Sequence, residues 1–345
     1  MKRSALALAV SVLALAPAAC ADDEPRTRPT SAVRADSVVA EDLDSPWSIA
    51  FYGETPLVSE RDSARVLELD AAGTPRQVAV IDDVEPSGEG GLLGIAVHDD
   101  FLYTYFTADA ENRVQRFPIA GDAGALTLGE PETVIDEIPA ASNHNGGRIA
   151  FGPDGMLYVT TGDAGEAENA QDSSSLSGKI LRLTPDGAVP DDNPLSGSPV
   201  YSFGHRNPQG IAWADDGTMY ASEFGQDTWD ELNVIEPGRN YGWPDVEGVA
   251  DRSGFVDPIQ QWSPSEASPS GIAVVGDDIL IANLRGESLR RVPRNARGTS
   301  TETFTDLGRL RDVVVAPNGE VWVVTNNTDG RGDPADGDDR IMRAR

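Results

Sequence analysis

The chain has 345 residues, of which 39% are hydrophobic, so it can bury a substantial core and is not expected to be disordered. Its net charge of −30 argues against nucleic acid or an anionic membrane surface as a partner, because both require a basic face. The 35 glycines and 24 prolines fit a fold of short strands joined by tight turns. A single cysteine, Cys20, excludes an intrachain disulfide.

Residues 1–20 have the composition of an export signal. Lys2 and Arg3 precede an apolar run that is too short, and wrongly flanked, for a membrane-spanning helix. The ending at 18–20 (AAC) is similar to a bacterial lipobox and predicts lipidation of Cys20; the alternative is an ordinary signal peptide with an incidental cysteine. We expect 21–36 to be a flexible tether and 37–345 the functional domain. The protein is thus expected to be exported, and either held at the outer face of the cell membrane by lipid alone or secreted or periplasmic.

A strand–turn–strand pattern recurs six times along the chain. Its first strands contain Ile49, Ile95, Ile149, Ile211, Ile272 and Val313. The turns at 153–155 (PDG) and 215–217 (DDG) are typical of hairpins, because glycine accepts a positive φ without strain. A third strand of alternating polarity follows each copy, at 65–69, 113–117, 179–183, 231–235, 288–292 and 340–344.

A fourth strand follows in five copies, for example at 77–81 and 132–136. We expect the segment 37–42 (SVVAED) to supply the fourth strand of the sixth copy, which closes a ring and leaves no raw sheet edge. The sequence therefore predicts an all-β fold: a six-bladed β-propeller of four-stranded antiparallel blades, closed by an N-terminal strand. A solenoid is the alternative, but it requires end caps. No long stretch has a 3.6-residue period, so few helices are expected.

Charged groups and glycines gather at equivalent positions of the repeats. In a propeller blade the first strand lines the central channel and the second runs antiparallel to it, so residues before the first strand and after the second share a face. The segments before the first strands are 89–91, 144–148, 206–210, 269–271 and 309–312; those after the second strands are 162–163, 223–227, 283–285 and 326–327. We therefore expect the functional site at this mouth of the channel.

His144 is the candidate general base, because imidazole titrates near neutrality. Asp163 is expected beside it, where a carboxylate fixes the tautomer and stabilises the imidazolium. The alternative is a loop histidine whose hydrogen bonds are already satisfied. The other two histidines, His98 and His205, are interpreted as structural, His98 because it lies within a first strand.

Arginines at the predicted mouth indicate a polyanionic ligand, since the planar guanidinium suits carboxylates; ordinary surface charge is the alternative. They are Arg206, Arg285, Arg309 and Arg311, in a chain with 27 basic and 57 acidic residues. No GxxxxGK loop and no GxGxxG helix start occurs, which disfavours nucleotide cofactors. No cysteine or histidine cluster suits zinc or copper, so oxygen ligands leave calcium or magnesium as the expected metal.

Four segments resemble those of the PQQ-dependent soluble glucose and aldose sugar dehydrogenases, the glucose/sorbosone dehydrogenase family. They are 144–163 (HNGGRIAFGPDGMLYVTTGD), 204–213 (GHRNPQGIAW), 223–244 (EFGQDTWDELNVIEPGRNYGWP) and 308–319 (GRLRDVVVAPNG). The resemblance covers roughly residues 38–345. It implies the quinone PQQ and Ca²⁺ as cofactors, an aldose sugar as substrate, and an electron acceptor that the sequence does not identify.

The resemblance also implies roles in catalysis. His144 would remove the proton of the sugar's anomeric hydroxyl, with Asp163 holding it, while a hydride passes from the anomeric carbon to the quinone and a lactone forms. Arg206 would stabilise the negative charge that grows on the quinone oxygen.

Cofactor-binding roles follow from the same resemblance. Arg309 and Arg311 match paired arginines that hold PQQ carboxylates, and Asn207 is assigned to the cofactor. The main-chain carbonyls of Gly225 and Gln226 would bind calcium, which acts as a Lewis acid on the quinone.

The chain departs from the glucose-type pattern at several cofactor and substrate positions. Glu89 stands where glucose-type members have a cofactor-contacting glutamine, and Arg285 stands where a lysine is usual; both are assigned to the cofactor. Asn143 replaces an acid that contacts sugar, and with Trp262 it is assigned to the substrate. The longer loops that contact substrate and form the dimer in the glucose-type enzyme are also missing from this sequence. The sequence therefore supports PQQ binding better than it supports specificity for glucose. We also expect the protein to be a monomer.

Two other functions fit a propeller with oxygen ligands. A calcium-dependent, lactonase-like hydrolase would use carbonyl and carboxylate ligands with water as nucleophile, although it has no need of an arginine cluster. A non-catalytic carbohydrate-binding propeller would keep only the scaffold.

Overall fold

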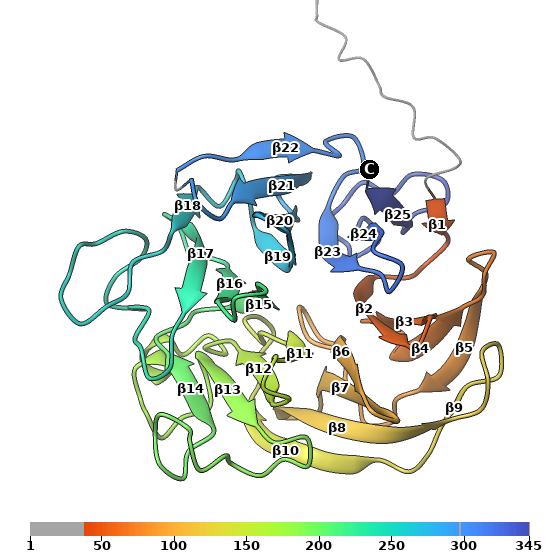
Figure 1. Cartoon of the computed structure of the whole chain (residues 1–345), viewed down its shortest axis with the longest axis horizontal. Coiled ribbons are helices and arrows are strands. Elements are labelled where there is room, and N and C mark those ends of the chain that lie inside the picture. The colour runs from red at the N-terminus through yellow and green to blue at the C-terminus, as the bar shows by residue number, and fades with distance from the viewer. Residues whose placement is uncertain (1–37, 297, 345) are drawn as a thin grey trace, which may run out of the picture. The chain divides into compact units, whose positions relative to one another are not determined.

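Six antiparallel β-sheets make up the structure, a computed structural model that describes residues 38–296 and 298–344 (Figure 1). The sheets stand around a central axis as blades, which confirms the predicted six-bladed β-propeller. Among the described residues the one helical element is a 3-10 turn at Ala167–Ala170. None of their helical segments is long and apolar enough to cross a membrane.

Each blade has four main strands, named in order from the axis outward. Blade 1 contains β2 (Pro46–Tyr52), β3 (Thr55–Glu60), β4 (Arg65–Leu69) and β5 (Pro75–Val80). Blade 2 contains β6 (Leu92–His98), β7 (Phe101–Thr107), β8 (Glu111–Ala120) and β10 (Glu132–Pro139), with β9 (Thr127–Leu128) paired to β8. Blade 3 contains β11 (Ile149–Phe151), β12 (Leu157–Thr161), β13 (Lys179–Leu183) and β14 (Val200–Phe203).

The second half of the ring has the same plan. Blade 4 contains β15 (Pro208–Trp213), β16 (Met219–Glu223), β17 (Asp230–Ile235) and β18 (Gln260–Trp262). Blade 5 contains β19 (Pro269–Val275), β20 (Asp278–Asn283), β21 (Ser288–Pro293) and β22 (Thr301–Thr303). Blade 6 contains β23 (Leu310–Val315), β24 (Val321–Thr325), β25 (Ile341–Ala344) and, from the other end of the chain, β1 (Val38–Ala40).

The closing strand is confirmed by its pairing. β1 runs antiparallel to β25, with Val38 opposite Met342 and Ala40 opposite Ile341. Beyond the strand, the Leu43 amide donates to the Asp339 carbonyl at 3.0 Å. The sixth blade thus acquires its fourth strand as predicted, and its third strand is not left as an open edge.

The hydrophobic core lies between neighbouring blades, because each sheet buries its two faces against the next sheet. One cluster joins Ala50 and Leu57 of blade 1 to Ile95 and Phe106 of blade 2. Burial falls outward from the axis: most of β2 is buried, and all three residues of β22 are exposed. The inner strand β2 is therefore part of the core, whereas the outer strand β22 faces solvent.

Hairpin turns join the first and second strands on one face of the ring. Gly155 and Gly217 adopt φ of 73° and 84° at the two turns predicted from their sequence. Asp154 Oδ1 accepts the Met156 amide at 3.1 Å, so that turn satisfies its own backbone. The predicted signal at 1–20, Cys20 and the tether at 21–36 lie outside the described residues and stay predictions.

Candidate active site

The loops before the first strands and after the second strands meet at the face opposite the hairpin turns, as the alternation of strand direction requires. The Asp163 amide donates to the Arg206 carbonyl at 2.8 Å, joining blades 3 and 4. In blade 6 the Asn326 amide donates to the Arg309 carbonyl, also at 2.8 Å. The polar residues predicted from the sequence therefore share one mouth.

His144 and Asp163 form a hydrogen-bonded pair at this mouth. His144 Nδ1 lies 2.7 Å from Asp163 Oδ1, and Asp163 is only 1% exposed. Trp243 Nε1 donates to Asp163 Oδ2 at 2.8 Å and the Gly165 amide donates to Oδ1 at 2.8 Å. Burial alone would raise the pKa of Asp163, but these hydrogen bonds and the adjacent imidazole outweigh it, so the pKa lies below its usual value.

The orientation of the imidazole follows from this pair. Asp163 occupies Nδ1, and Nε2 of His144 has no hydrogen-bond partner among the described residues. The same arrangement, with one nitrogen held by a carboxylate and the other free, serves a general base in hydrolytic triads. The ring is thus suited to take a proton through Nε2.

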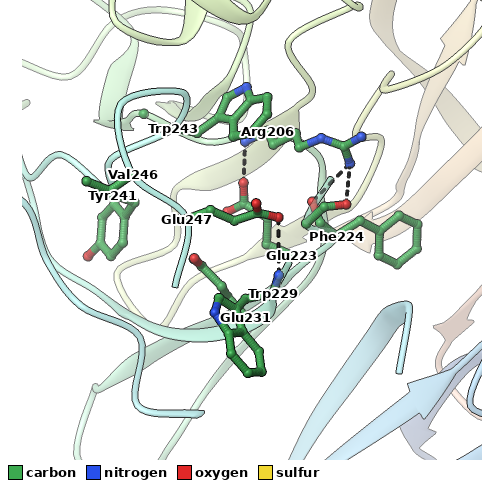
Figure 2. A pocket seen from close by; sticks show the side chains of 11 residues that line it. Arg206, Glu223, Phe224, Trp229, Glu231, Tyr241, Trp243, Val246 and Glu247 are labelled. Carbon is green, nitrogen blue, oxygen red and sulfur yellow. Dashed lines mark hydrogen bonds between the residues drawn. The ribbon is translucent and has the colours of Figure 1, made fainter. Parts of the chain in front are cut away.

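Arg206 accepts the Asp163 amide through its carbonyl, and its side chain is held by blade 4 (Figure 2). Its Nη1 donates to the carbonyl oxygens of Phe224 at 3.2 Å and Gly225 at 2.7 Å, and its guanidinium lies 5.4 Å from the Trp243 ring centre. The Arg206 amide donates to Glu223. A positive group therefore faces the Gly225 carbonyl, for which the family resemblance implies a calcium ion.

A small cavity of about 10 Å³ lies behind the Gly225 loop, enough for about one water (Figure 2). Glu223, Glu231 and Glu247 line it. Glu247 Oε1 accepts the amides of Gln226, Thr228 and Trp229 and so holds the loop. Burial, then the nearby Glu223, raises the pKa of Glu231 to about 8.

His205 is part of the scaffold under Arg206. It is fully buried, with Nδ1 2.8 Å from Glu223 Oε2 and Nε2 2.8 Å from Ser202 Oγ, and it stacks on Tyr241. His98 stacks on Phe151 at 4.1 Å between ring centres. Both histidines thus have the structural contacts expected of them.

The two arginines of blade 6 are almost completely buried. Arg309 is 8% exposed and its Nη2 pairs with Asp329 Oδ2 at 3.0 Å. Arg311 is 4% exposed, and its guanidinium donates to Asn326 Oδ1 and, at 2.8 Å, to Gln209 Oε1. Burial lowers the pKa of Arg311 to about 9, although Asp329 opposes this. Burying these positive charges together therefore costs free energy. An anionic ligand bound beside them would offset that cost.

Arg61 belongs to the same charge cluster, although its sequence position did not mark it as a site residue. It is buried, it pairs with Asp62 at 2.6 Å, and its charge contributes to the lowered pKa of Arg311. It lies directly after β3, as Gly162 lies directly after β12, so it belongs to the segments that follow the second strands. This place in the repeat is the signal in the sequence that points to it.

An ion pair crosses the ring beneath the mouth. Arg148 of blade 3 donates to Asp312 Oδ2 of blade 6 at 2.9 Å and to Ser48 Oγ of blade 1 at 3.0 Å. The Arg148 guanidinium lies 4.3 Å from the Trp47 ring centre, and that of Arg311 lies 5.8 Å from it. Trp47 and Arg148 thus form a buried floor to the site.

The other predicted cofactor residues are spread around the mouth. Asn207 is fully buried and its Oδ1 accepts the Gly146 amide at 3.0 Å. Glu89 accepts hydrogen bonds from the His144 amide and from Arg331. Arg285 is exposed, and its side chain has no partner among the described residues.

The two predicted substrate residues have different surroundings. Asn143 is half-buried next to His144. Trp262 ends β18 on the mouth side, but its ring is buried in the cluster between blades 4 and 5, 4.9 Å below the Arg290 guanidinium. These are the contacts of a core residue, and its substrate role stays a prediction.

Several buried donors at the mouth have no hydrogen-bond partner among the described residues. They are Arg206 Nε, Asn207 Nδ2 and Arg309 Nε, with Arg148 Nη2 below them. Buried polar groups are normally paired, because an unpaired donor costs free energy. All four are donors, so the mouth suits a ligand rich in acceptors.

The fold and the site together describe a propeller with a hydrogen-bonded histidine–aspartate pair beside an arginine-rich mouth. The family model described as Glucose / Sorbosone dehydrogenase matches residues 43–336. The chain therefore belongs to the glucose/sorbosone dehydrogenase family, as its motifs predicted, and is an oxidoreductase of the sugar dehydrogenase class.

Known relatives agree with this assignment. The chain is 50% identical to the PQQ-bound aldose sugar dehydrogenase from Streptomyces coelicolor, over 89% of this chain and 95% of that one, with a TM-score of 0.85. It is 30% identical to an aldose sugar dehydrogenase of Escherichia coli, over 85% of this chain and 90% of the relative. Quinoprotein glucose dehydrogenase B of Acinetobacter calcoaceticus is also 30% identical, over 64% of this chain and 54% of its own length.

Proposed function

We propose that the protein oxidises aldose sugars at the anomeric carbon, giving lactones, with PQQ as cofactor and Ca²⁺ beside it. The observation that carries this proposal is the set of unpaired buried donors: Arg206 Nε, Asn207 Nδ2 and Arg309 Nε. PQQ presents carboxylates and quinone carbonyls, all of them acceptors, so the residues fit it. The PQQ-bound relative at 50% identity supports the same cofactor.

His144 is the proposed base of the reaction. Its Nε2 takes the proton of the anomeric hydroxyl, and the oxygen left behind forms the lactone carbonyl as the carbon loses a hydride. PQQ, when bound, supplies the two-electron acceptor for that hydride. Asp163, with its lowered pKa, remains ionised and stabilises the imidazolium that His144 becomes.

The arginines of blade 6 are the proposed anchors for the cofactor. Arg309 and Arg311 already hold a carboxylate, Asp329, and an amide oxygen, Asn326, so their donors point to acceptor groups. Arg285 stands at the rim with its charge unpaired among the described residues. These groups bind and orient the ligand, whereas Arg206 is placed to stabilise negative charge on it.

Calcium is proposed at the main-chain carbonyls of Gly225 and Gln226. The proposal is supported by the Gly225 oxygen, which accepts from the positively charged Arg206 guanidinium at 2.7 Å. Carbonyl oxygens are common calcium ligands.

Hydrolysis or simple sugar binding remains a weaker alternative, since neither explains why four arginines are buried near one mouth. They are Arg61, Arg148, Arg309 and Arg311. Acids pair closely with Arg61, Arg148 and Arg309. The guanidinium of Arg311 donates instead to the neutral oxygens of Asn326 and Gln209, so its buried charge is the one that an anionic ligand would chiefly offset.

Reconstitution tests the proposal directly. PQQ is titrated into the purified protein with Ca²⁺ or with chelator while tryptophan fluorescence is followed, and dye reduction is then measured with a panel of aldoses. We expect saturable binding and sugar-dependent reduction, both weakened by chelator. No binding and no reduction with PQQ and Ca²⁺ together would refute the proposal, and release of acid from added lactones would favour the hydrolase.

We also propose export and lipidation at Cys20, supported only by the signal-like composition of residues 1–20. Expression of Cys20→Ala in a bacterial host tests it: the variant should pass from the membrane fraction to the soluble exported fraction.

A further inference from the structure

Glu89 occupies a position between three blades. It precedes β6 of blade 2, and its Oε2 accepts the His144 amide of blade 3 at 3.1 Å. Its Oε1 accepts from Arg331 Nη1 at 2.9 Å, and Arg331 lies in the β24–β25 connection of blade 6. Because blade 1 lies between blades 6 and 2, this carboxylate connects blades that are not neighbours in the ring.

The contact with His144 is reinforced by the backbone. The Glu89 amide donates to the Ser142 carbonyl at 2.9 Å, so the two loops are joined by one main-chain and one side-chain hydrogen bond. A side chain at Gly88 would come within 2.1 Å of the Ser142 oxygen, which shows how close the loops approach. The loop carrying His144 is therefore built against the Glu89 segment.

His144 needs such support because its backbone is strained. Its φ is 56°, in the left-handed region that residues with a side chain rarely adopt. Glu89 holds its amide, Ala164 donates to its carbonyl at 3.1 Å, and Asp163 holds Nδ1. Every polar atom of His144 except Nε2 is thus fixed.

We propose that Glu89, held by Arg331, is a positioning residue that fixes the backbone of His144 and tunes the charge around its ring. This inference rests on the proposed role of His144 as a base. It gives a physical reason for an acid at this position, where glucose-type members have a glutamine. It also assigns Arg331, which no sequence motif singled out, to the active site.

The Glu89 carboxylate and the Arg331 guanidinium should act in opposite directions on the charge of the His144 ring. Burial would raise the pKa of Glu89, but the His144 amide and Arg331 outweigh it and the pKa is lowered, so Glu89 is ionised near neutrality. Arg61 and Arg311 also face this carboxylate. A negative charge near the imidazole favours its protonated form, and the positive charge of Arg331 opposes that effect.

Histidine NMR tests the charge effect without cofactor or sugar. The chain has three histidines, so the ring signals are assigned with His98→Gln and His144→Gln, and His144 is titrated in the cofactor-free protein. In Glu89→Gln its midpoint should fall, and in Arg331→Gln it should rise, each by roughly half a pH unit. Arg331→Lys should restore the parental midpoint of His144. The midpoint of His98 should not change in any of these variants. The control variant Arg291→Gln, at an exposed ion pair, should leave the midpoint of His144 unchanged.

Kinetics of the reconstituted enzyme tests positioning. Glu89→Gln keeps an oxygen for the His144 amide and should lose less kcat than Glu89→Ala. Glu89→Ala should lose about tenfold or more, because small misplacements of a base are costly. Its KM should change less than kcat.

Three outcomes are decisive. An unmoved His144 midpoint in both charge variants, or shifts in the same direction, would overturn the tuning. A Glu89→Ala enzyme with parental kcat would overturn the positioning. Absence of sugar oxidation in the parent, with the opposite NMR shifts still present, would sink the proposed function and leave the Glu89–Arg331 arrangement established.

Discussion

The two faces of the propeller satisfy their polar groups in different ways. At the hairpin face, Asp154 accepts the amide of Met156, two residues along the chain. At the mouth, Asp163 accepts from Trp243, which is 80 residues distant. The turn at 153–155 is thus stabilised within one blade, although contacts between blades also occur on the hairpin face, as in the Arg294–Asp216 pair. At the mouth, a contact between blades holds the proposed base itself, because Asp163 also binds His144.

The largest effect should come from removing the proposed base. In His144→Gln, kcat for sugar oxidation should fall roughly 10²–10⁴-fold, while PQQ titration by fluorescence stays close to parental. His98→Gln is the matched control and should keep its activity. A near-parental kcat in the His144 variant with normal PQQ binding would show that another group takes the proton.

Removing a cofactor anchor at the mouth should weaken cofactor binding, and it should also lower stability, because the buried carboxylate of Asp329 loses its closest charged partner. Arg309→Ala should weaken PQQ affinity by about 10–100-fold, because a charge-assisted hydrogen bond is lost from a buried site. Arg291→Ala, which breaks an exposed ion pair with Asp278 in blade 5, should leave affinity unchanged. Equal affinity in the two variants would exclude Arg309 from the binding site.

The burial of acids behind the mouth should appear as a pH dependence of stability. The pKa of Glu231 is about 8, above the value near 4.3 expected in an unfolded chain. Between these values the folded protein holds a proton that the unfolded chain has lost, so stability falls as pH rises through this window. Glu231→Gln has no carboxyl group to titrate, so it should not show this fall in stability with pH.

Thermal unfolding in chelator measures the effect. The stability of Glu231→Gln relative to the parent should increase between pH 5 and pH 8, by on the order of 1–3 kcal/mol. The exposed control Asp245→Asn should show no such trend. A constant difference between Glu231→Gln and parent across this range would contradict the raised pKa.

The smallest effect should come from the hairpin face. Gly155→Ala should cost about 1 kcal/mol, because its φ is 73° and no atom lies within 4 Å of the added Cβ. Its activity should be parental. Gly88→Ala should cost more and lower kcat, since its Cβ would strike the loop that carries His144. Similar stability and activity in Gly155→Ala and Gly88→Ala would contradict the expected difference between the hairpin face and the mouth.

Much of the scaffold was predictable because its determinants are local. The third strands were placed within a few residues of their observed bounds, for example β4 at 65–69 and β13 at 179–183. Alternating polarity, glycine turns and the missing sixth-blade strand are all properties of short segments. The gathering of His144, Asp163, Arg206, Arg309 and Arg311 at one mouth followed from strand direction alone.

The partners of those residues were not predictable. The charge of Arg61 reaches Arg311 of blade 6 only in the folded ring, and the pairing of Glu89 with Arg331 joins residues 242 positions apart. The contact of Arg148 with Asp312 spans 164 positions. No local pattern encodes such pairs, because they depend on the twist of each blade and on the path of the loops between blades.

The amino-acid sequence alone was enough to establish the six blades, their closure, the face that carries the site and the family to which the chain belongs. The folded ring was needed to show which nitrogen of His144 is free, that the Gly225 carbonyl oxygen meets Arg206, and which charges share a buried space. The two kinds of information differ in range, because hydrophobic periodicity acts over a few residues along the chain. Hydrogen bonds and ion pairs depend on distances of about 3 Å between groups that come together only when the ring is complete.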